Sequence, residues 1–371
     1  MERKTFLWGM LGIVGLAAGG GTWFTSQPKF GQLPSGARLA RIQASPHYVN
    51  GKFQCLEPVE VMAKDGNRLS AMLKFLTRDT KGLVPQQPML SQKTGIASLP
   101  RNEDVLIWLG HSSYYMQLGG WRVLIDPVFS DYGSPVFFVN RAFPGSNVYT
   151  AADFPEIDLL AITHDHWDHL DYDTVMALRP KIHHIVCPLG VGEYFEQWGF
   201  DPAILHEEDW DTEIPLARDF SVHILPSQHF SGRFLTQNPT EWCAFAFTTP
   251  KRKVFCSGDG GYGAHFAAIG QRFGGFDLAI MENGQYNERW HKIHMLPPET
   301  AQAAADVGAQ QVVASHNGKF ALALHPWQEP CIEMAKFSKG KPYEWLTPMI
   351  GEKVLIGEKG QKFSRWWEKM A

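Results

Sequence analysis

Six consecutive residues, His164-Asp165-His166-Trp167-Asp168-His169, bring together four side chains that bind metal ions well. Imidazole nitrogens and carboxylate oxygens are the ligands that suit zinc and related divalent ions. If the segment leaves a strand in an extended conformation, His164 and His166 point the same way, and a following turn lets Asp168 and His169 face a second position. We therefore expect one loop to supply ligands to two neighbouring metal ions.

Three further polar residues follow apolar runs, where a ligand at the end of a strand is expected. They are His229, Asp259 and His316. Each of them alone is compatible with an ordinary loop residue. The density of the first cluster is hard to explain by packing, and it is this density that predicts a catalytic pair of metals completed from elsewhere in the chain.

The elements that must position these residues are visible as short apolar runs. Runs at 105–109, 114–118 and 122–125 are separated by glycine, which is typical of adjacent strands. A further run at 159–163 ends directly at the histidine cluster. Helices are expected over 172–178 and from Pro297 to Val307, the second with proline in its first turn. Further strands are expected at 184–187, 221–225, 244–248, 254–256, 278–281 and 311–314. Strands in meander order interleaved with helices predict an α+β fold, an αββα sandwich.

The motifs resemble those of the metallo-β-lactamase fold, whose signature is His-x-His-x-Asp-His after a strand, followed by a distant His, Asp and His. Within that superfamily the chain is most similar to the zinc phospholipases D that hydrolyse N-acylphosphatidylethanolamine. The resemblance runs from about 105 to 350. It includes Leu109-Gly110-His111, Ile125-Asp126-Pro127-Val128-Phe129-Ser130, Pro226-Ser227-Gln228-His229, Gly258-Asp259-Gly260-Gly261-Tyr262 and Phe320-Ala321-Leu322-Ala323.

The resemblance implies a site with two Zn²⁺ per chain, for which Mn²⁺ or Fe²⁺ are alternatives because they accept the same ligands. Metal one would take His164, His166 and His229, metal two would take Asp168, His169 and His316, and Asp259 would bridge both. A bridged pair suits phosphodiester and ester hydrolysis by a metal-bridging hydroxide. Asp259 and His294 are the expected catalytic residues, with His294 stabilising the oxyanion or protonating the leaving group.

Several other residues near these motifs have two interpretations. Asp126, Asp165 and Asp171 are candidates to hold the outer nitrogens of the ligand histidines, although capping roles fit them equally. His111 matches the family pattern, but we interpret it as a core or loop histidine. The glycines from Gly258 to Gly263 lack the ending of a phosphate-binding loop, so we expect them to allow close backbone approach to the metals.

The substrate is less well specified than the metal site. After His316 the chain has Asn317-Gly318-Lys319, where the animal phospholipase has aromatic-Gly-Thr, and Met295-Leu296-Pro297 also differs. The primary expectation is hydrolysis of (N-acyl)phospholipid headgroups. The alternatives are an ester or lactone hydrolase of the same fold and a non-catalytic metal-binding accessory protein.

The net charge of the chain limits its possible partners, and its N-terminal residues indicate a cellular location. Among its 371 residues 44% are hydrophobic, and the net charge of −4 argues against a nucleic-acid partner. Residues 1–28 have a charged start and then an apolar run, which predicts a signal peptide or membrane anchor. We therefore expect an exported, periplasmic or cell-surface protein, or one anchored to a membrane surface. An N-terminal extension (29–103), the hydrolase domain (104–350) and a C-terminal segment (351–371) would follow, and the sequence indicates no oligomeric state.

Overall fold

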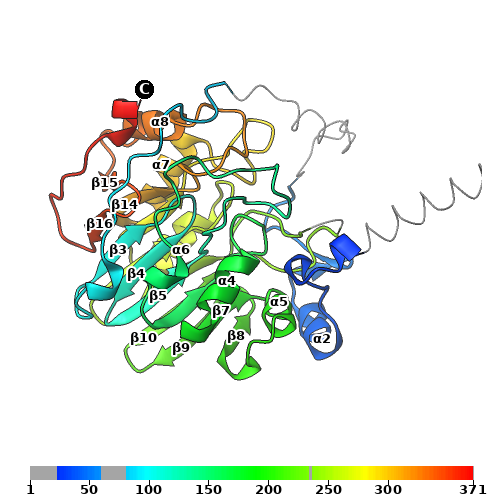
Figure 1. Ribbon diagram of the computed structural model, residues 1–371. Coiled ribbons are helices and arrows are strands. Elements are labelled where there is room, and N and C mark those ends of the chain that lie inside the picture. The colour runs from blue at the N-terminus through cyan, green and yellow to red at the C-terminus, as the bar shows by residue number, and fades with distance from the viewer. Residues whose placement is uncertain (1–22, 60–80, 234–235, 371) are drawn as a thin grey trace, which may run out of the picture.

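Two seven-stranded sheets lie face to face in the computed structural model, with helices on their outer faces (Figure 1). The structure describes residues 23–59, 81–233 and 236–370. A short hairpin, β1 (Tyr48–Val49) and β2 (Lys52–Phe53), stands apart from both sheets. The predicted α+β class and αββα sandwich are confirmed.

The first sheet has the strand order β16-β3-β4-β5-β6-β7-β8. Its strands pair antiparallel from β16 to β5 and parallel from β5 to β8. Their bounds are β3 (Val105–Trp108), β4 (Tyr114–Leu118), β5 (Trp121–Ile125), β6 (Ile157–Ala161), β7 (Ile182–Pro188), β8 (Leu205–Glu208) and β16 (Lys353–Leu355).

The second sheet has the order β15-β14-β13-β12-β11-β10-β9. It is antiparallel from β9 to β12 and parallel from β12 to β15. As a result β10, β12, β13 and β14 run in one direction and end at the same edge. Their bounds are β9 (Thr212–Ala217), β10 (Phe220–Leu225), β11 (Ala244–Thr248), β12 (Lys253–Cys256), β13 (Phe276–Glu282), β14 (Ala309–Ser315) and β15 (Glu344–Leu346).

Helices cover the outer faces of both sheets. On the first sheet lie α4 (Tyr172–Leu178) and α5 (Gly192–Gln197), and on the second lie α6 (His265–Phe273), α7 (Pro297–Asp306) and α8 (Glu329–Phe337). The prediction for α4 is confirmed, and α7 ends one residue earlier than predicted. Eight further elements were not predicted from the sequence: α2 (Gly36–Ala44), α5, α6, α8, β8, β9, β15 and β16. Short 3-10 helices occur at Pro28–Phe30, Ile96–Ser98, Ala151–Asp153, Arg179–Lys181, Pro202–Ile204 and Trp366–Met370.

The apolar runs seen in the sequence follow from burial on both faces of each sheet. In β3, Leu106 and Trp108 point into the core between the sheets, whereas Ile107 and the adjoining Leu109 pack under the helices of the first sheet. Strands covered on both sides are apolar at successive positions rather than at every second one.

The N-terminal extension is fixed to the first sheet by a charge cluster around Arg38 of α2. The guanidinium pairs with Glu193 at 2.9 Å, Glu196 at 2.7 Å and Glu207 at 2.8 Å. Glu193 and Glu196 belong to α5 and Glu207 to β8. Buried charges of this kind are tolerated because each has a partner. The cluster therefore joins α2 to the domain that carries the metal loop.

The fold continues past the predicted boundary at residue 350. Strand β16 pairs with β3, and Trp366 and Trp367 pack into the core between the sheets. Residues 351–371 are therefore, as far as they are described, part of the sandwich rather than a separate segment. None of the helices in the described ranges is long and apolar enough to cross a bilayer. Most of the predicted signal or anchor, residues 1–22, lies outside the described residues.

Candidate metal centre

The predicted ligands meet at one edge of the sandwich, at the ends of strands from both sheets. The loop with His164, His166, Asp168 and His169 follows β6. His229 follows β10, Asp259 follows β12 and His316 directly follows β14. All seven predicted ligands are brought together there, in overlapping groups whose ligand atoms lie within 4.8 Å of one another.

The first group is formed by three histidines, His164, His166 and His229. The Nε2 of His164 lies 2.9 Å from Nδ1 of His166, which lies 3.3 Å from Nε2 of His229. Tetrahedral zinc, with Zn–N distances of about 2.0–2.1 Å, places its ligand nitrogens about 3.3 Å apart. The two separations are near this value, so the three nitrogens are close enough together to share one divalent ion.

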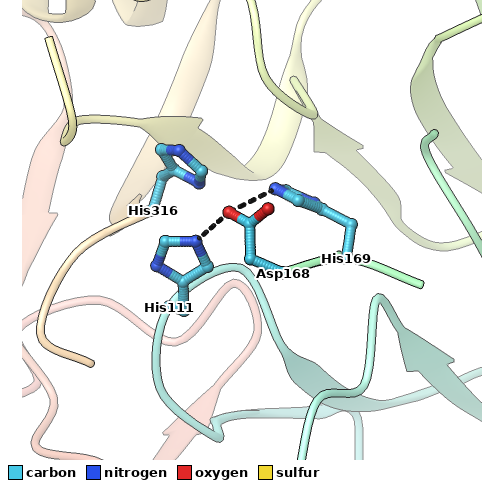
Figure 2. Close-up of side chains that lie close together, drawn as sticks. All are labelled: His111, Asp168, His169 and His316. Atoms are coloured by element: carbon cyan, nitrogen blue, oxygen red, sulfur yellow. Dashed lines mark hydrogen bonds and ion pairs between the residues drawn. The ribbon is translucent and has the colours of Figure 1, made fainter. Parts of the chain in front are cut away.

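The second group contains Asp168, His169 and His316, together with His111 (Figure 2). Asp168 Oδ2 lies 3.6 Å from Nε2 of His169 and 2.8 Å from Nε2 of His111. His111 is fully buried, as expected of a core histidine, but it also contacts a predicted ligand. It holds the Asp168 carboxylate in place, a role that the sequence analysis did not assign to it.

Asp259 stands between the two groups, and its carboxylate approaches histidines of both. Its Oδ2 lies 3.1 Å from Nε2 of His169, 3.8 Å from Nε2 of His229 and 3.9 Å from Nε2 of His164. Its Oδ1 lies 3.1 Å from Nδ1 of His316. This is the placement that a bridging carboxylate requires.

The second ring nitrogens of several histidines in the site are held by oxygen atoms. Nδ1 of His169 contacts Asp126 at 2.8 Å, and Nδ1 of His229 contacts the carbonyl of Ile293 at 3.0 Å. Such contacts orient a ligand ring and fix its tautomer. Of the three aspartates predicted to hold a ligand histidine, Asp126 therefore does so, through His169.

Asp165 and Asp171 have structural partners instead. Asp165 accepts hydrogen bonds from the Tyr194 hydroxyl and the Gly232 amide. Asp171 accepts from the Ser130 amide and from Thr174 in the first turn of α4. Both carboxylates therefore shape the metal loop from outside the cluster.

The charge balance of the site favours a cation. Burial holds the pKa of His164, His229 and His316 well below the usual value and lowers the pKa of His166 to about 4, so these rings are neutral, as metal ligands must be. Burial alone would also lower the pKa of His169, yet the carboxylates of Asp259, Asp168 and Asp126 raise it well above the usual value. Three buried carboxylates around one ring leave an excess of negative charge.

Two buried atoms at the centre of the site point to the same conclusion. His169 Nε2 and Asp259 Oδ1 make no hydrogen bond of good geometry, although each lies 3.1 Å from a polar atom of another side chain in the cluster. Buried polar atoms are normally paired because an unpaired one costs free energy. Their position between two sets of nitrogen and oxygen donors fits divalent ions, so the residues present suit the metals that the fold family binds.

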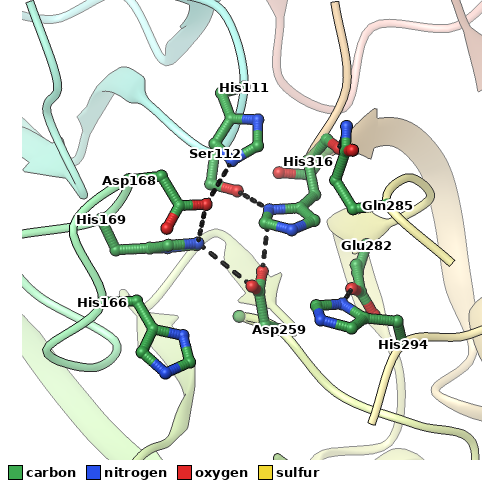
Figure 3. A network of polar contacts seen from close by, with 12 residues as sticks. His111, Ser112, His166, Asp168, His169, Asp259, Glu282, Gln285, His294 and His316 are labelled. Atoms are coloured by element: carbon green, nitrogen blue, oxygen red, sulfur yellow. Dashed lines mark hydrogen bonds and ion pairs between the residues drawn. The ribbon is translucent and has the colours of Figure 1, made fainter. Parts of the chain in front are cut away.

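Glu282 was not predicted from the sequence, and it supports His294 (Figure 3). Glu282 is the last residue of β13, is fully buried, and its Oε1 forms a short contact with Nδ1 of His294. An acidic residue at the end of the apolar run 278–281 was a usable signal, because the other strand-end ligands occupy equivalent places. His294 lies beside the cluster, with its ring centroid 5.0 Å from that of His229 and 5.3 Å from that of His316.

Two further missed residues contact His316. The Ser112 hydroxyl lies 2.9 Å from Nδ1 of His316, and the Gln285 amide nitrogen donates to the His316 carbonyl at 3.3 Å. The Gln285 side chain also accepts from the amides of Leu322 and Ala323. Gln285 therefore ties His316 to the loop after Phe320.

The glycines after Asp259 approach backbone and side-chain atoms of neighbouring loops. A Cβ at Gly261 would lie 2.0 Å from the Lys292 carbonyl oxygen, and one at Gly260 would lie 2.4 Å from Ser227 Oγ. The glycines thus let the loop that carries Asp259 pack against the loops of His294 and His229. The expected close backbone approach to the metals stays a prediction beside these contacts.

Lys319 is a buried cation behind the site whose ionisation affects stability. Its ammonium donates to the Val128 carbonyl at 2.5 Å, and burial lowers its pKa to about 7. Between pH 7 and about 10.5 the unfolded chain therefore keeps a proton that the folded chain has lost. The free energy of unfolding should rise with pH in this window, by up to about 1.4 kcal/mol per pH unit from this residue.

Lys319→Met should remove this contribution, because methionine fills similar space without a titrating group. Urea unfolding of both proteins at pH 7, 8 and 9 measures it. We expect the stability of the wild type relative to Lys319→Met to increase at each step. A difference that is constant across the three pH values would contradict the assignment.

Comparison with known proteins places the chain among metal-dependent hydrolases. A family described as the beta-lactamase superfamily domain matches residues 121–317. An uncharacterized protein of Mycobacterium tuberculosis is 34% identical over 351 residues, covering 92% of this chain and 94% of its own length. The outer membrane protein RomA of Klebsiella pneumoniae is 55% identical over 106 residues, covering 29% of this chain and 80% of its own length.

Two other matches bear on activity and fold. The N-acyl-phosphatidylethanolamine-hydrolyzing phospholipase D of Saccharomyces cerevisiae mitochondria is 31% identical over 236 residues, which is 60% of this chain and 49% of that protein. The solved structure of Igni18, a metallo hydrolase from Ignicoccus hospitalis, aligns with a TM-score of 0.52 at 19% identity, covering 68% of this chain and 97% of its own. The second match supports the fold only.

Proposed function

This chain belongs to the beta-lactamase superfamily of metal-dependent hydrolases, and we propose that it is a zinc-dependent phosphodiesterase of phospholipase D type that acts on (N-acyl)phospholipid headgroups. The observation that carries this proposal is Asp259, whose carboxylate approaches both ligand groups: Oδ2 lies 3.8 Å from Nε2 of His229, and Oδ1 lies 3.1 Å from Nδ1 of His316. The similarity to the yeast phospholipase D supports the choice of substrate class.

The residues that would hold the ions follow from the two groups. His164, His166 and His229 would bind the first ion, and Asp168, His169 and His316 the second, with Asp259 shared between them. Two divalent ions in such a site would acidify a water and neutralise charge on phosphoryl oxygens. Mn²⁺ or Fe²⁺ are the alternatives, because nitrogen and oxygen ligands bind them too.

Neighbouring residues of the chain orient the ligand side chains. Asp126 and the Ile293 carbonyl fix the rings of His169 and His229, and His111 fixes the Asp168 carboxylate. His294, held by Glu282, faces the same space and is the residue placed to move a proton during the reaction. The preorganised donors and acceptors would therefore need little rearrangement when substrate binds.

A lipid substrate is supported by apolar side chains next to the metal loop. Trp23 is 69% exposed, and the adjoining Phe24 contacts Phe30 at a ring distance of 4.9 Å. Phe30 in turn contacts Trp167, which lies within the metal loop, at 5.2 Å. Aromatic contacts therefore connect Phe24, through Phe30, to Trp167 of the metal loop.

A second apolar element lies beside the first. Phe137 and Phe138 are 76% and 66% exposed, on a loop that receives a hydrogen bond of 2.7 Å from Lys29 to the Pro135 carbonyl. Exposed aromatic residues of this kind suit a membrane–water interface. Together with the similarity to RomA, they support an exported or membrane-anchored enzyme that works at a lipid surface.

A hydrolysis panel with matched metal analysis tests the proposal. The full chain would be assayed with N-acylphosphatidylethanolamine in mixed micelles, bis-p-nitrophenyl phosphate and simple lactones, before and after removal of metal by a chelator. We expect about two zinc ions per chain, hydrolysis of both phosphodiesters, and loss of that activity on chelation with recovery on adding Zn²⁺. A preference for lactones would replace the phosphodiesterase proposal by the ester or lactone hydrolase, and a protein that binds metal without turnover would support an accessory role.

A further inference from the structure

Glu282 is fully buried, and each of its carboxylate oxygens has hydrogen-bond partners. Oε2 accepts from the Gly260 amide at 3.1 Å and from the Met295 amide at 3.2 Å. Oε1 contacts Nδ1 of His294. Gly260 follows Asp259, and Met295 follows His294, so one side chain links the loops that carry these two residues.

The orientation of His294 leaves its second nitrogen facing the cluster. Figure 3 shows Nδ1 directed at Glu282 and the other ring nitrogen on the side of Asp259. The His294 ring lies parallel to that of His316, with an interplanar angle of 11°. The side chain of His294 is 13% exposed, so the ring stands at the border between the buried cluster and the space from which substrate would arrive.

The amides of Gly260 and Met295 influence where the proton lies between Glu282 and His294. Both amides donate to Oε2 and so favour the ionised carboxylate, which leaves Oε1 as an acceptor. Burial opposes them, because it raises the pKa of Glu282. The Gly260 and Met295 amides occupy Oε2, so the ionised carboxylate is left with Oε1 as the acceptor for an Nδ1–H of His294.

We propose that Glu282 is a positioning residue that locks His294 in the Nδ1–H tautomer, so that the bare Nε2 faces the metal centre as an acceptor. The inference rests on the proposed function only for the identity of the reaction. In hydrolysis of a phosphodiester, Nε2 takes a proton from the attacking water as the new O–P bond forms. It gives that proton to the leaving oxygen when the other P–O bond breaks, so His294 ends as it began. The oxyanion role expected from the sequence would need Nε2–H instead.

Glu282→Gln separates this role from simple packing. The Gly260 and Met295 amides need an acceptor, so the Gln carbonyl oxygen must face them and its NH₂ group must face His294. The ring then has to accept at Nδ1 and carry its proton on Nε2. A comparable tautomer change in the Ser-His-Asp triad costs about 10⁴-fold in kcat. General acid–base catalysis typically contributes about 10²–10⁴-fold.

The tautomer is measured by nitrogen NMR of the zinc-loaded full chain labelled with ¹⁵N-histidine, with the His294 signal identified from its absence in His294→Asn. We expect Nδ1–H in the wild type and Nε2–H in Glu282→Gln, with the zinc content and melting temperature of the two proteins matching. On whichever substrate the panel identifies, kcat should fall about 10²–10⁴-fold while KM changes less than about threefold.

Glu299→Gln is the matched control. Glu299 contacts Nδ1 of His291 at 3.2 Å and accepts from the Leu296 amide at 2.9 Å, a similar arrangement at the start of α7. Its kcat should stay within about twofold of the wild type. Nε2–H in wild-type His294 would overturn the proposal, even if Glu282→Gln does not fold, and so would a kcat of Glu282→Gln close to that of the wild type. These results do not depend on which ester is hydrolysed, so they are distinct from a failure of the phosphodiesterase proposal.

Discussion

Asp259→Ala should lower kcat by at least about 10³-fold and reduce the bound metal below two ions per chain. Asp259 is 4% exposed, and its carboxylate approaches His229 of the first ligand group and His316 of the second. Removing the carboxylate leaves the two ions without a shared ligand and without the negative charge that offsets their repulsion. Metal analysis and kcat on bis-p-nitrophenyl phosphate measure the two effects.

The isosteric variant Asp259→Asn isolates the charge. It keeps the side-chain volume and one carbonyl oxygen, so we expect it to fold and to retain one metal ion better than the second. The control is Asp211→Asn, which removes an exposed ion pair of 2.6 Å with Arg272 that includes none of the predicted metal ligands. Two tightly bound ions and near-wild-type turnover in Asp259→Asn would show that residue 259 does not bridge.

Arg233→Met should lower the free energy of unfolding by about 3–5 kcal/mol. Arg233 is 6% exposed, and its guanidinium donates to the carbonyls of Asp165, Leu170 and Lys29. Methionine preserves much of the apolar volume but leaves three carbonyl groups without their donor. Urea unfolding followed by fluorescence measures the loss.

The same variant should also weaken metal binding, because Asp165 and Leu170 flank the ligands of the metal loop. We expect the affinity for zinc to fall about 10–100-fold, as it does when groups that orient ligands are removed. Arg365→Met is the control, since its ion pair with Glu368 is about half exposed and should contribute less than about 0.5 kcal/mol. Unchanged stability and zinc affinity in Arg233→Met would contradict the role of Arg233.

The strands and the ligand loop were predictable because their signals are local. A strand that is buried on both faces produces a continuous apolar run. The runs at 105–109 and 159–163 are examples, and both belong to the first sheet. The prediction for α4 matched its bounds because Asp171 precedes it and an apolar pattern follows. The weaker elements α5 and β8 were missed, since their residues are partly polar and their stability depends on the contacts with Arg38.

The residues that support the metal ligands were harder to predict from the sequence. Nothing near Glu282 in the sequence indicates that its partner is His294, twelve residues further on, or that the Gly260 amide completes its hydrogen bonding. His111 was interpreted as a core histidine because a single buried histidine usually is one, yet it contacts Asp168, which is 57 residues away.

The sequence by itself determined which atoms this protein can offer to metal ions, because residue type and the strand before each residue are local properties. His164, His166, Asp168 and His169 were recognisable for that reason. Only the tertiary structure decided which nitrogen each ring presents and where each buried charge finds its partner. Those outcomes depend on the burial of polar groups, and burial is created by segments such as the Arg233 loop and the end of β13, which meet only when the two sheets have packed together.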